Sequence, residues 1–290
     1  HANLTLNSVV NRGTFTLMAT DGGYDANATG TLTNEPGATI SMVATGGGMR
    51  RIYGTVINSG NISVNGVGTN HRGTWTNTGN FTVAGSGYAR FDTNPTFNQN
   101  AGMISVSSGD FWLYGGTFNL NGGELAGNVG IHNGTVTVAP AVTGKVQTQG
   151  SIALSGTIGT EFEYWARGSS SIGHSTTDMT NVVNHGKVTL ETANGGYDTQ
   201  MSGTMTNASD GTWSMLAGGG GTRRANGTFI NNGAFNVSNV RTELRGTFTN
   251  TGTIDVTGTG YVEAFTSPTF NMNAGSLTTS QHFWLHGGTM

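Results

Sequence analysis

The chain has 290 residues, of which only 9% are charged, and its formal net charge is −3. That balance leaves no basic surface for nucleic acid or an anionic membrane, and no apolar run approaches the roughly 18 residues that span a bilayer. The absence of Cys excludes disulfides and thiolate metal sites. We therefore expect no nucleic-acid partner, no membrane insertion and no cofactor.

Glycine accounts for 49 of the 290 residues, well above the roughly 7% of an average protein. Such a composition is compatible with a disordered, low-complexity chain. However, 34% of the residues are hydrophobic and 9% are aromatic, and they are spread evenly along the chain. These residues predict a buried core that is built by repetition.

An eleven-residue element recurs in both halves of the chain. The clearest copies are GTVINSGNISV (54–64), GTWTNTGNFTV (73–83), GTFINNGAFNV (227–237) and GTFTNTGTIDV (246–256). Looser copies begin at Gly30, Pro95, Gly116, Gly203 and Pro268. Neighbouring starts lie 19 to 24 residues apart, a period that is typical of solenoids.

Within the element, apolar residues alternate with Thr, Ser and Asn, which is the period of a β-strand. In the copy at 73–83, the side chains expected to point inward include Trp75, Phe81 and Val83. No segment has the 3.6-residue pattern of a helix. The sequence therefore predicts an all-β fold, a parallel β-helix (β-solenoid) with about 19–24 residues per coil and roughly 13 coils.

The clear copies contain the pattern Asn-x-Gly, which predicts a corner between two strands, and the looser copies at Gly30 and Gly203 have slightly longer corners, NEPG (34–37) and NASDG (207–211). We expect the Asn to point inward, to bond backbone groups and to stack on the Asn of the next coil. We expect the Gly to supply the backbone torsions of the corner. The predicted corner residues are Asn34, Asn58, Gly60, Asn77, Gly79, Asn207, Asn231, Gly233, Asn250 and Gly252.

The whole pattern repeats at an offset of 173 residues. Residues 1–173 form a first long repeat of about eight coils, and residues 174–290 form a second, incomplete repeat that continues the first. Neither end shows a polar cap of the kind that closes a solenoid. We therefore expect a piece of a longer array, or self-association end to end or laterally.

The residues after each element form an arc of variable length, and two arcs of neighbouring coils carry opposite charges. DGGYD (21–25) precedes GGGMRR (46–51) by one coil, and the second long repeat has matching segments. We expect each Asp to form an inter-coil ion pair with one of the two Arg, contributing about 0–1 kcal/mol. A Ca²⁺ site is the weaker alternative, because the Gly/Asp motif is not in tandem. The residues concerned are Asp25, Arg50, Arg51, Asp198, Arg223 and Arg224.

The segment TEFEYWAR (160–167) places Glu161, Glu163, Trp165 and Arg167 on one face if it is a strand. Paired carboxylates beside an aromatic ring could grip or cut a glycan. The alternative is a solvated strand face whose charges aid solubility. The seven His show no metal-ligand spacing, so we expect no metal site.

Two other surface patterns are left open. Arg90 aligns with Glu263 across the long repeat, which indicates surface drift and not a shared ligand. Rows of Thr, such as Thr74 and Thr76, could order water as in ice-binding proteins, but Ile57 and Asn98 interrupt the matching positions.

The segments VINSGNISV (56–64) and FTNTGTIDV (248–256) resemble the repeats of large secreted bacterial surface proteins, namely filamentous-haemagglutinin-like exoproteins and autotransporter passenger domains. The resemblance implies a right-handed parallel β-helix, an extracellular or cell-surface location, and a role in adhesion or surface coating. We expect a structural segment of a surface fibre, filament or adhesin stalk that is not an enzyme. The alternative is a glycan-binding or glycan-cleaving β-helix.

Overall fold

The computed structural model describes residues 1–20 and 22–289, and every regular element in these ranges is a β-strand. The chain divides into two compact units: unit 1 is His1–Thr137 with Ala141–Val146, and unit 2 is Val138–Pro140 with Gln147–Met290. Both units are built from parallel strands stacked as a β-solenoid, and together they comprise about 13 turns. The predicted all-β solenoid is therefore confirmed. The second long sequence repeat, which starts at His174, begins inside unit 2.

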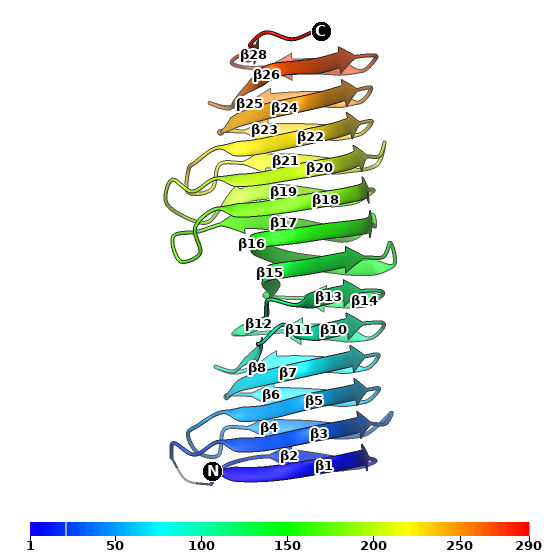
Figure 1. The fold of residues 1–290 in the computed structure, drawn as a ribbon, viewed down its shortest axis with the longest axis vertical. Helices are drawn as coiled ribbons and strands as arrows, with labels where there is room; N and C mark the ends of the chain where they lie inside the picture. The colour runs from blue at the N-terminus through cyan, green and yellow to red at the C-terminus, as the bar shows by residue number, and fades with distance from the viewer. Residues whose placement is uncertain (21, 290) are drawn as a thin grey trace. The chain divides into compact units, whose positions relative to one another are not determined.

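The first coils of unit 1 consist of a long strand, a corner and a shorter strand, whereas two later coils have two short strands in place of the long one (Figure 1). The strands are β1 (Ala2–Asn11), β2 (Thr14–Leu17), β3 (Ala26–Asn34), β4 (Thr39–Val43), β5 (Arg50–Asn58), β6 (Asn61–Asn65), β7 (Gly68–Asn77), β8 (Asn80–Ala84), β9 (Tyr88–Phe91), β10 (Thr96–Gln99), β11 (Met103–Val106), β12 (Asp110–Tyr114), β13 (Thr117–Leu120) and β14 (Gly123–Ala126). Strands β15 (Val129–Val138) and β16 (Val142–Ile158) contribute residues to both units.

Unit 2 repeats the same plan. Its strands are β17 (Phe162–Gly168), β18 (Ser175–Asn184), β19 (Lys187–Thr192), β20 (Thr199–Asn207), β21 (Thr212–Leu216), β22 (Arg223–Asn231), β23 (Ala234–Ser238), β24 (Arg241–Asn250), β25 (Thr253–Thr257), β26 (Tyr261–Met272), β27 (Ser276–Thr279) and β28 (Phe283–Leu285). Long strands pair with long strands and short with short, as in β20–β22 and β21–β23.

The pairing register aligns the sequence repeats. In unit 1, Asn34 pairs with Asn58 and Asn58 with Asn77; in unit 2, Asn207 pairs with Asn231 and Asn231 with Asn250. Each residue therefore stacks on its own counterpart one coil away. Because side chains on a strand alternate between two faces, one register places every apolar position of the element inside.

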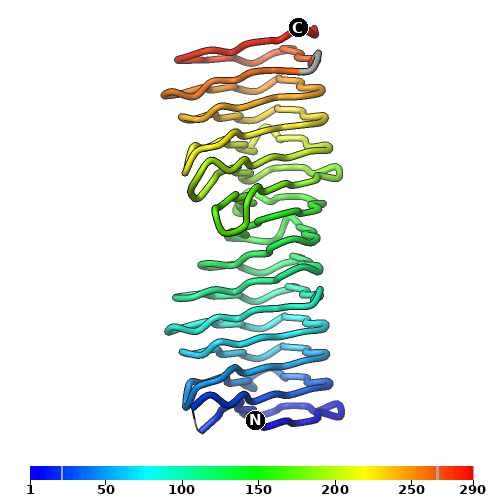
Figure 2. Tube along the Cα trace, turned by 60° about the vertical axis from the view of Figure 1, so that its left-hand side comes forward, coloured from blue at the N-terminus to red at the C-terminus, as the bar shows by residue number. Residues whose placement is uncertain are grey.

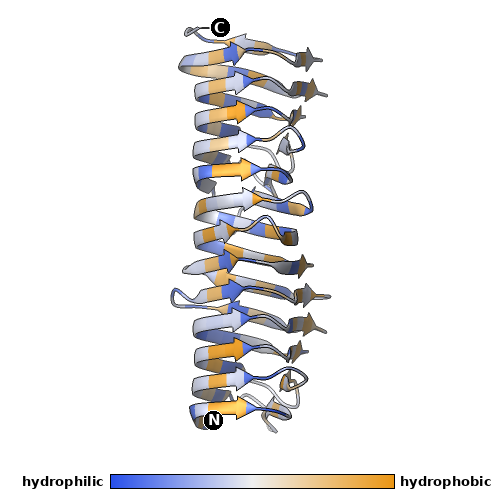
Figure 3. Ribbon diagram, turned by 90° about the vertical axis from the view of Figure 1, so that its right-hand side faces the viewer, coloured by the Kyte–Doolittle hydropathy of each residue, from blue (hydrophilic) through white to orange (hydrophobic). Residues whose placement is uncertain are grey.

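The core of each unit is a column of aliphatic and aromatic side chains, and apolar and polar residues alternate along the strands that enclose it (Figure 3). In unit 1, Trp75 stacks on Phe97 with ring centroids 6.5 Å apart. In unit 2, Phe248 stacks on Phe270 at 5.2 Å. His71 also belongs to this core, since it is fully buried between Trp75 and Phe91. Burial lowers the pKa of His71 to about 3.

Glycines are required at the corners because the backbones of neighbouring coils approach each other closely there. The prediction that these glycines supply unusual backbone torsions is wrong. None of Gly60, Gly79, Gly233 or Gly252 has a positive φ. A Cβ at Gly60 would collide with the carbonyl oxygen of Ala38, and one at Gly79 with that of Gly60. The corner backbone of one coil therefore rests directly on the corner of the coil before it.

The long strands extend further than the sequence indicates, because part of the predicted variable arc is strand. Strand β7 already begins at Gly68 and β24 at Arg241. A glycine column bends these strands in the middle: φ is 132° at Gly54 and 93° at Gly73, a region that disfavours other residues. The bend divides each long strand into two halves, and the outward side of the first half points in a different direction from that of the second. Figure 2 shows the Cα trace of the stacked coils within each unit.

Candidate functional site

Buried asparagines form a hydrogen-bonded ladder at the corner of each unit. Asn34 Nδ2 donates to Asn58 Oδ1 at 2.7 Å, and Asn58 Nδ2 donates to Asn77 Oδ1 at 2.6 Å. In unit 2, Asn207 donates to Asn231 at 2.7 Å and Asn231 to Asn250 at 2.6 Å. The structure therefore brings all the predicted corner asparagines together within their units.

The ladder has further members that the sequence reasoning missed. Asn11 donates to Asn34 at 2.7 Å, Asn77 donates to Gln99 Oε1 at 2.8 Å, and Asn184 donates to Asn207 at 2.7 Å. The segments VVNRG (9–13) and VVNHG (182–186) contain the same Asn-x-Gly pattern, so the signal was present. Gln99 carried no such signal, because its corner lacks that spacing.

The ladder amides also satisfy backbone carbonyls at the corner. Asn34 Nδ2 lies 3.3 Å from the carbonyl oxygen of Ala38 and 3.1 Å from that of Asn61. Buried polar groups are costly without partners, and here each amide serves two neighbouring coils. The arrangement joins neighbouring coils through side-chain hydrogen bonds.

Arg50 and Arg223 do not form the predicted ion pairs. Both side chains are fully buried, and each guanidinium lies inside the Gly-rich loop that precedes its strand. Arg50 donates to the carbonyl oxygens of Val43 at 2.9 Å and Gly47 at 3.2 Å. Arg223 donates to Leu216 at 2.8 Å and also to Gly220 and Ala217. Burial lowers the pKa of Arg223 to about 10.

The other arginine of each pair makes the inter-coil ion pair. Arg51 Nη1 bonds the carboxylate of Asp25, and Arg224 Nη1 bonds that of Asp198. The Met49 N–H and Arg51 together lower the pKa of Asp25. Burial would raise the pKa of Asp198, but its hydrogen bonds to Thr222 N–H and Arg224 outweigh burial and lower it.

In unit 1, the outward face of the first half of the long strands carries alternating tyrosines and arginines, which we name the Tyr–Arg face: Tyr53, Arg72, Tyr88, Arg90 and Tyr114. The guanidinium carbon of Arg72 lies 4.7 Å from the ring centroid of Tyr53. That of Arg90 lies 4.7 Å from Tyr88 and 5.6 Å from Tyr114. Both arginines are exposed.

Asparagines accompany the acidic groups of the same face. Asn70 Nδ2 donates to Asp92, and Asn128 Nδ2 donates to Asp110. Trp112 lies on this outward side of its strand yet is only 8% exposed, beside Tyr114 at 6.5 Å. The face therefore offers carboxylates, amides, hydroxyls and guanidinium groups at neighbouring positions.

In unit 2, the equivalent face holds a network of ion pairs, which we name the ion-pair face: Arg224, Arg241, Glu243, Arg245 and Glu263. Glu243 is only 4% exposed and meets Arg224 at 3.0 Å, Arg241 at 3.0 Å and Arg245 at 2.8 Å. Arg241 Nε also lies 2.8 Å from Glu263. Every guanidinium on this face thus has a carboxylate partner in its own unit.

The segment proposed for glycan contact lies partly on β17. Glu161 is in the turn before the strand, whereas Glu163, Trp165 and Arg167 share its outward side. Lys187 Nζ lies 3.1 Å from Glu163, and Trp165 Nε1 donates to Glu191 Oε2 at 2.9 Å. The Arg167 guanidinium lies 4.5 Å from the Trp165 ring centroid. The structure therefore brings Arg167 and Trp165 into contact, whereas Glu163, on the same side of the strand, is engaged by Lys187.

The hydroxyl rows differ from the expected pattern, because one column is unbroken. Thr55 pairs with Thr31 and with Thr74, and the column continues through Thr96 and Thr117. The interruptions at Ile57 and Asn98 fall in the adjacent column.

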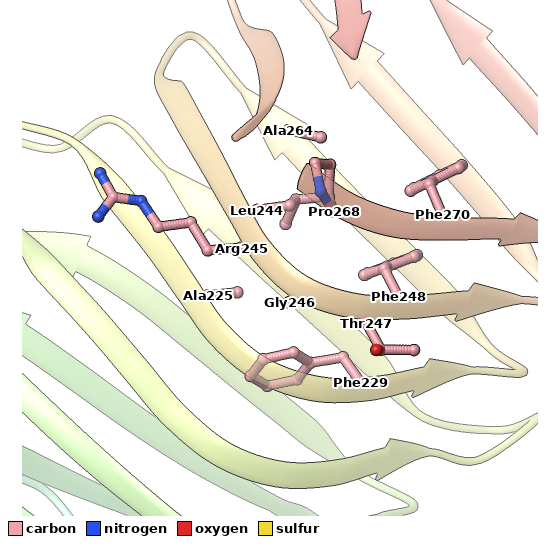
Figure 4. Close-up of a pocket in the computed structure, with 10 residues that line it drawn as sticks. All are labelled: Ala225, Phe229, Leu244, Arg245, Gly246, Thr247, Phe248, Ala264, Pro268 and Phe270. Carbon is pink, nitrogen blue, oxygen red and sulfur yellow. The ribbon is translucent and has the colours of Figure 1, made fainter. Parts of the chain in front are cut away.

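A small depression in unit 2 lies on the inner side of the strand bend (Figure 4). Phe229, Phe248 and Phe270 come from the paired long strands β22, β24 and β26, Gly246 lies at the bend of β24, and Arg245 extends away from the rings. The depression is an apolar seam of the core. Within residues 1–20 and 22–289, no group of three or more His, Asp or Glu side chains could hold a metal ion.

Comparison with known proteins found no match. No protein-family model, curated protein or solved structure matches the chain. Among the described residues, no helix is long and apolar enough to cross a membrane. The similarity to secreted bacterial surface proteins therefore remains a resemblance of repeat pattern.

Proposed function

We propose that the chain is a structural segment of an extracellular or cell-surface fibre, filament or adhesin stalk, with no catalytic role. One observation carries the proposal: within each unit, successive coils join in register through their strands and through the buried Asn ladder. Pulling one coil from the next would break parallel strand pairs and leave buried amides without partners.

The surface composition supports the same role. The outward positions are mostly Thr, Ser and Asn, and several of the few charges are paired inside their own unit. A weakly charged, hydroxyl-rich surface allows copies to pack closely without repulsion. We therefore propose that copies associate with one another, end to end or laterally.

Sedimentation velocity over a wide concentration range, combined with electron microscopy, tests this function. We expect the sedimentation coefficient to rise with concentration and the micrographs to show filaments or bundles. A chain that stays monomeric at high concentration would contradict self-association. Protease treatment of intact source cells tests the location, because a surface protein is removed whereas an interior protein is protected.

Glycan binding is the second candidate function, and the Tyr–Arg face favours it. Aromatic rings beside exposed guanidinium and amide groups can contact both the faces and the hydroxyls of sugars. The carboxylate of Glu163 is occupied by Lys187 and by the Thr189 hydroxyl at 2.7 Å. Binding therefore has more support than cleavage.

A further inference from the structure

We propose that the Tyr–Arg face of unit 1 binds an acidic polysaccharide built from uronic acids. This inference names a ligand class for the second candidate function, and it does not depend on the structural role. It concerns Tyr53, Arg72, Tyr88, Arg90 and Tyr114, together with the polar side chains between them.

The guanidinium groups of Arg72 and Arg90 are available to bind an anionic ligand. Within residues 1–20 and 22–289, neither Arg72 nor Arg90 has a carboxylate within 4.0 Å, and both are exposed. Arg51 on the neighbouring coil is already engaged by Asp25. A planar guanidinium with free N–H groups is suited to a carboxylate, which it can hold with two parallel hydrogen bonds.

The tyrosines hold these guanidinium groups in place. Arg72 lies over Tyr53, and Arg90 lies between Tyr88 and Tyr114. The Tyr88 ring fits because residue 68 is Gly, where any Cβ would collide with that ring. Less side-chain entropy is lost when the ligand binds, because stacking has already restricted both arginines.

The acidic side chains of the face favour a glycan over a nucleic acid. Asp92 and Asp110 each accept a hydrogen bond from an Asn amide, and they retain oxygens that can accept from sugar hydroxyls. A nucleic acid presents a phosphate at every nucleotide, which would meet these two carboxylates as well as the arginines. A polyuronate combines many hydroxyls with more widely spaced carboxylates, and this matches the mixture of groups.

The corresponding face of unit 2 lacks the free charge. Arg245 occupies the position of Arg72 in the long repeat, but it bonds Glu243 at 2.8 Å. Glu263 replaces Arg90, and Arg241 replaces Gly68 and forms ion pairs with both glutamates. The ion-pair face therefore serves as an internal control whose guanidinium groups already have carboxylate partners.

Isothermal titration calorimetry with polygalacturonate oligosaccharides tests the proposal on the full chain. We expect binding that weakens as salt is added. Arg72→Gln/Arg90→Gln should lose about tenfold or more in affinity for each arginine. The matched pair Arg241→Gln/Arg245→Gln removes the same charge from unit 2 and should change the affinity less than about threefold.

Other outcomes of these titrations would contradict the proposal. No binding to polygalacturonate, or an equal loss in both double variants, would overturn the proposal. Equal or tighter binding of neutral dextran would exclude charge recognition, and tighter binding of oligo(dT) would identify a nucleic-acid surface instead. Arg72→Lys/Arg90→Lys, which keeps the charge on these exposed positions, should retain part of the affinity; an affinity as low as that of the Gln pair would also contradict the assignment.

Discussion

Units 1 and 2 share the polar contacts of their interior but differ on the outward face of the first half of the long strands. In both units the corner asparagines, the buried arginine of the loop and the inter-coil Asp–Arg pair occupy the same positions. On the outward face, unit 1 stacks arginines on tyrosines whereas unit 2 pairs them with glutamates.

This difference separates the requirements of the fold from those of the surface. Interior residues stack on their counterparts one coil away, so a change in one coil disturbs both neighbours. Outward residues face water, so side chains of different chemical types can occupy the same position without changing the backbone. Gly68 and Arg241 occupy the same repeat position, and one makes room for a ring whereas the other completes an ion-pair network.

The largest effect is expected from the shared interior. Arg223→Met should destabilise unit 2 by about 3–5 kcal/mol, because the loop carbonyls lose a buried cationic donor. Arg50→Met should have a similar effect in unit 1. Hydrogen exchange resolved by segment would measure both; a loss below about 1 kcal/mol in either would show that the loop does not depend on its arginine.

The ladder should respond next most strongly. Asn231→Leu removes bonds to Asn207 and Asn250, and we expect a loss of about 2–3 kcal/mol from the amides left unpaired. Denaturant unfolding would measure it. The control Asn232→Leu changes an adjacent outward residue and should be nearly neutral, so equal effects would contradict the ladder's importance.

His71 in the interior of unit 1, where unit 2 has Leu244, predicts a pH dependence of the stability of unit 1. The ordinary His pKa of 6.5 applies to the unfolded chain, whereas burial lowers the pKa of folded His71 to about 3. Between these values the unfolded chain binds a proton that the folded chain does not, so stability falls as pH drops below about 6.5.

From about pH 7.5 to about pH 5, this difference should cost unit 1 about 2 kcal/mol. His71→Leu introduces the residue that unit 2 has at Leu244 and should remove the effect. Unfolding measured at both pH values checks it. An unchanged pH dependence in the variant would mean that another group is responsible.

The smallest effect is expected on the outward face. Glu243→Asn gives unit 2 the residue that unit 1 has at Asn70, and three guanidinium groups lose their common carboxylate. We expect a loss of about 1 kcal/mol that shrinks as salt is added. Salt-dependent unfolding measures it, and a stabilising change would show that the network serves another purpose.

The sequence predicted the solenoid and its corner because both depend on short-range patterns. Alternation assigns Trp75 and Asn77 to the interior, and the repeat spacing stacks them on their counterparts. The same alternation, followed back from Val56 through Ile52, places Arg50 inside and Arg51 outside. The signal that separates the two arginines was therefore in the sequence, although the arc was not expected to be strand.

The Tyr–Arg face could not be predicted in the same way. Its contacts join residues of different coils, such as Arg72 with Tyr53 and Arg90 with Tyr114, and the intervening loops differ in length. Which side chains meet depends on the coil-to-coil register of β5, β7, β9 and β12. The alignment of Arg90 with Glu263 indicated neutral change at the surface, because the sequence does not show which residues of the neighbouring coils lie beside each of them.

The asparagine ladder also gives each unit a direction. Every amide nitrogen donates toward the following coil, from Asn11 to Gln99 in unit 1 and from Asn184 to Asn250 in unit 2. The amide dipoles therefore align head to tail and polarise one another. A chain of this kind can lengthen by duplicating whole coils, since each copy accepts from the coil before it and donates to the next, whereas inserting half a coil would reverse or interrupt the row.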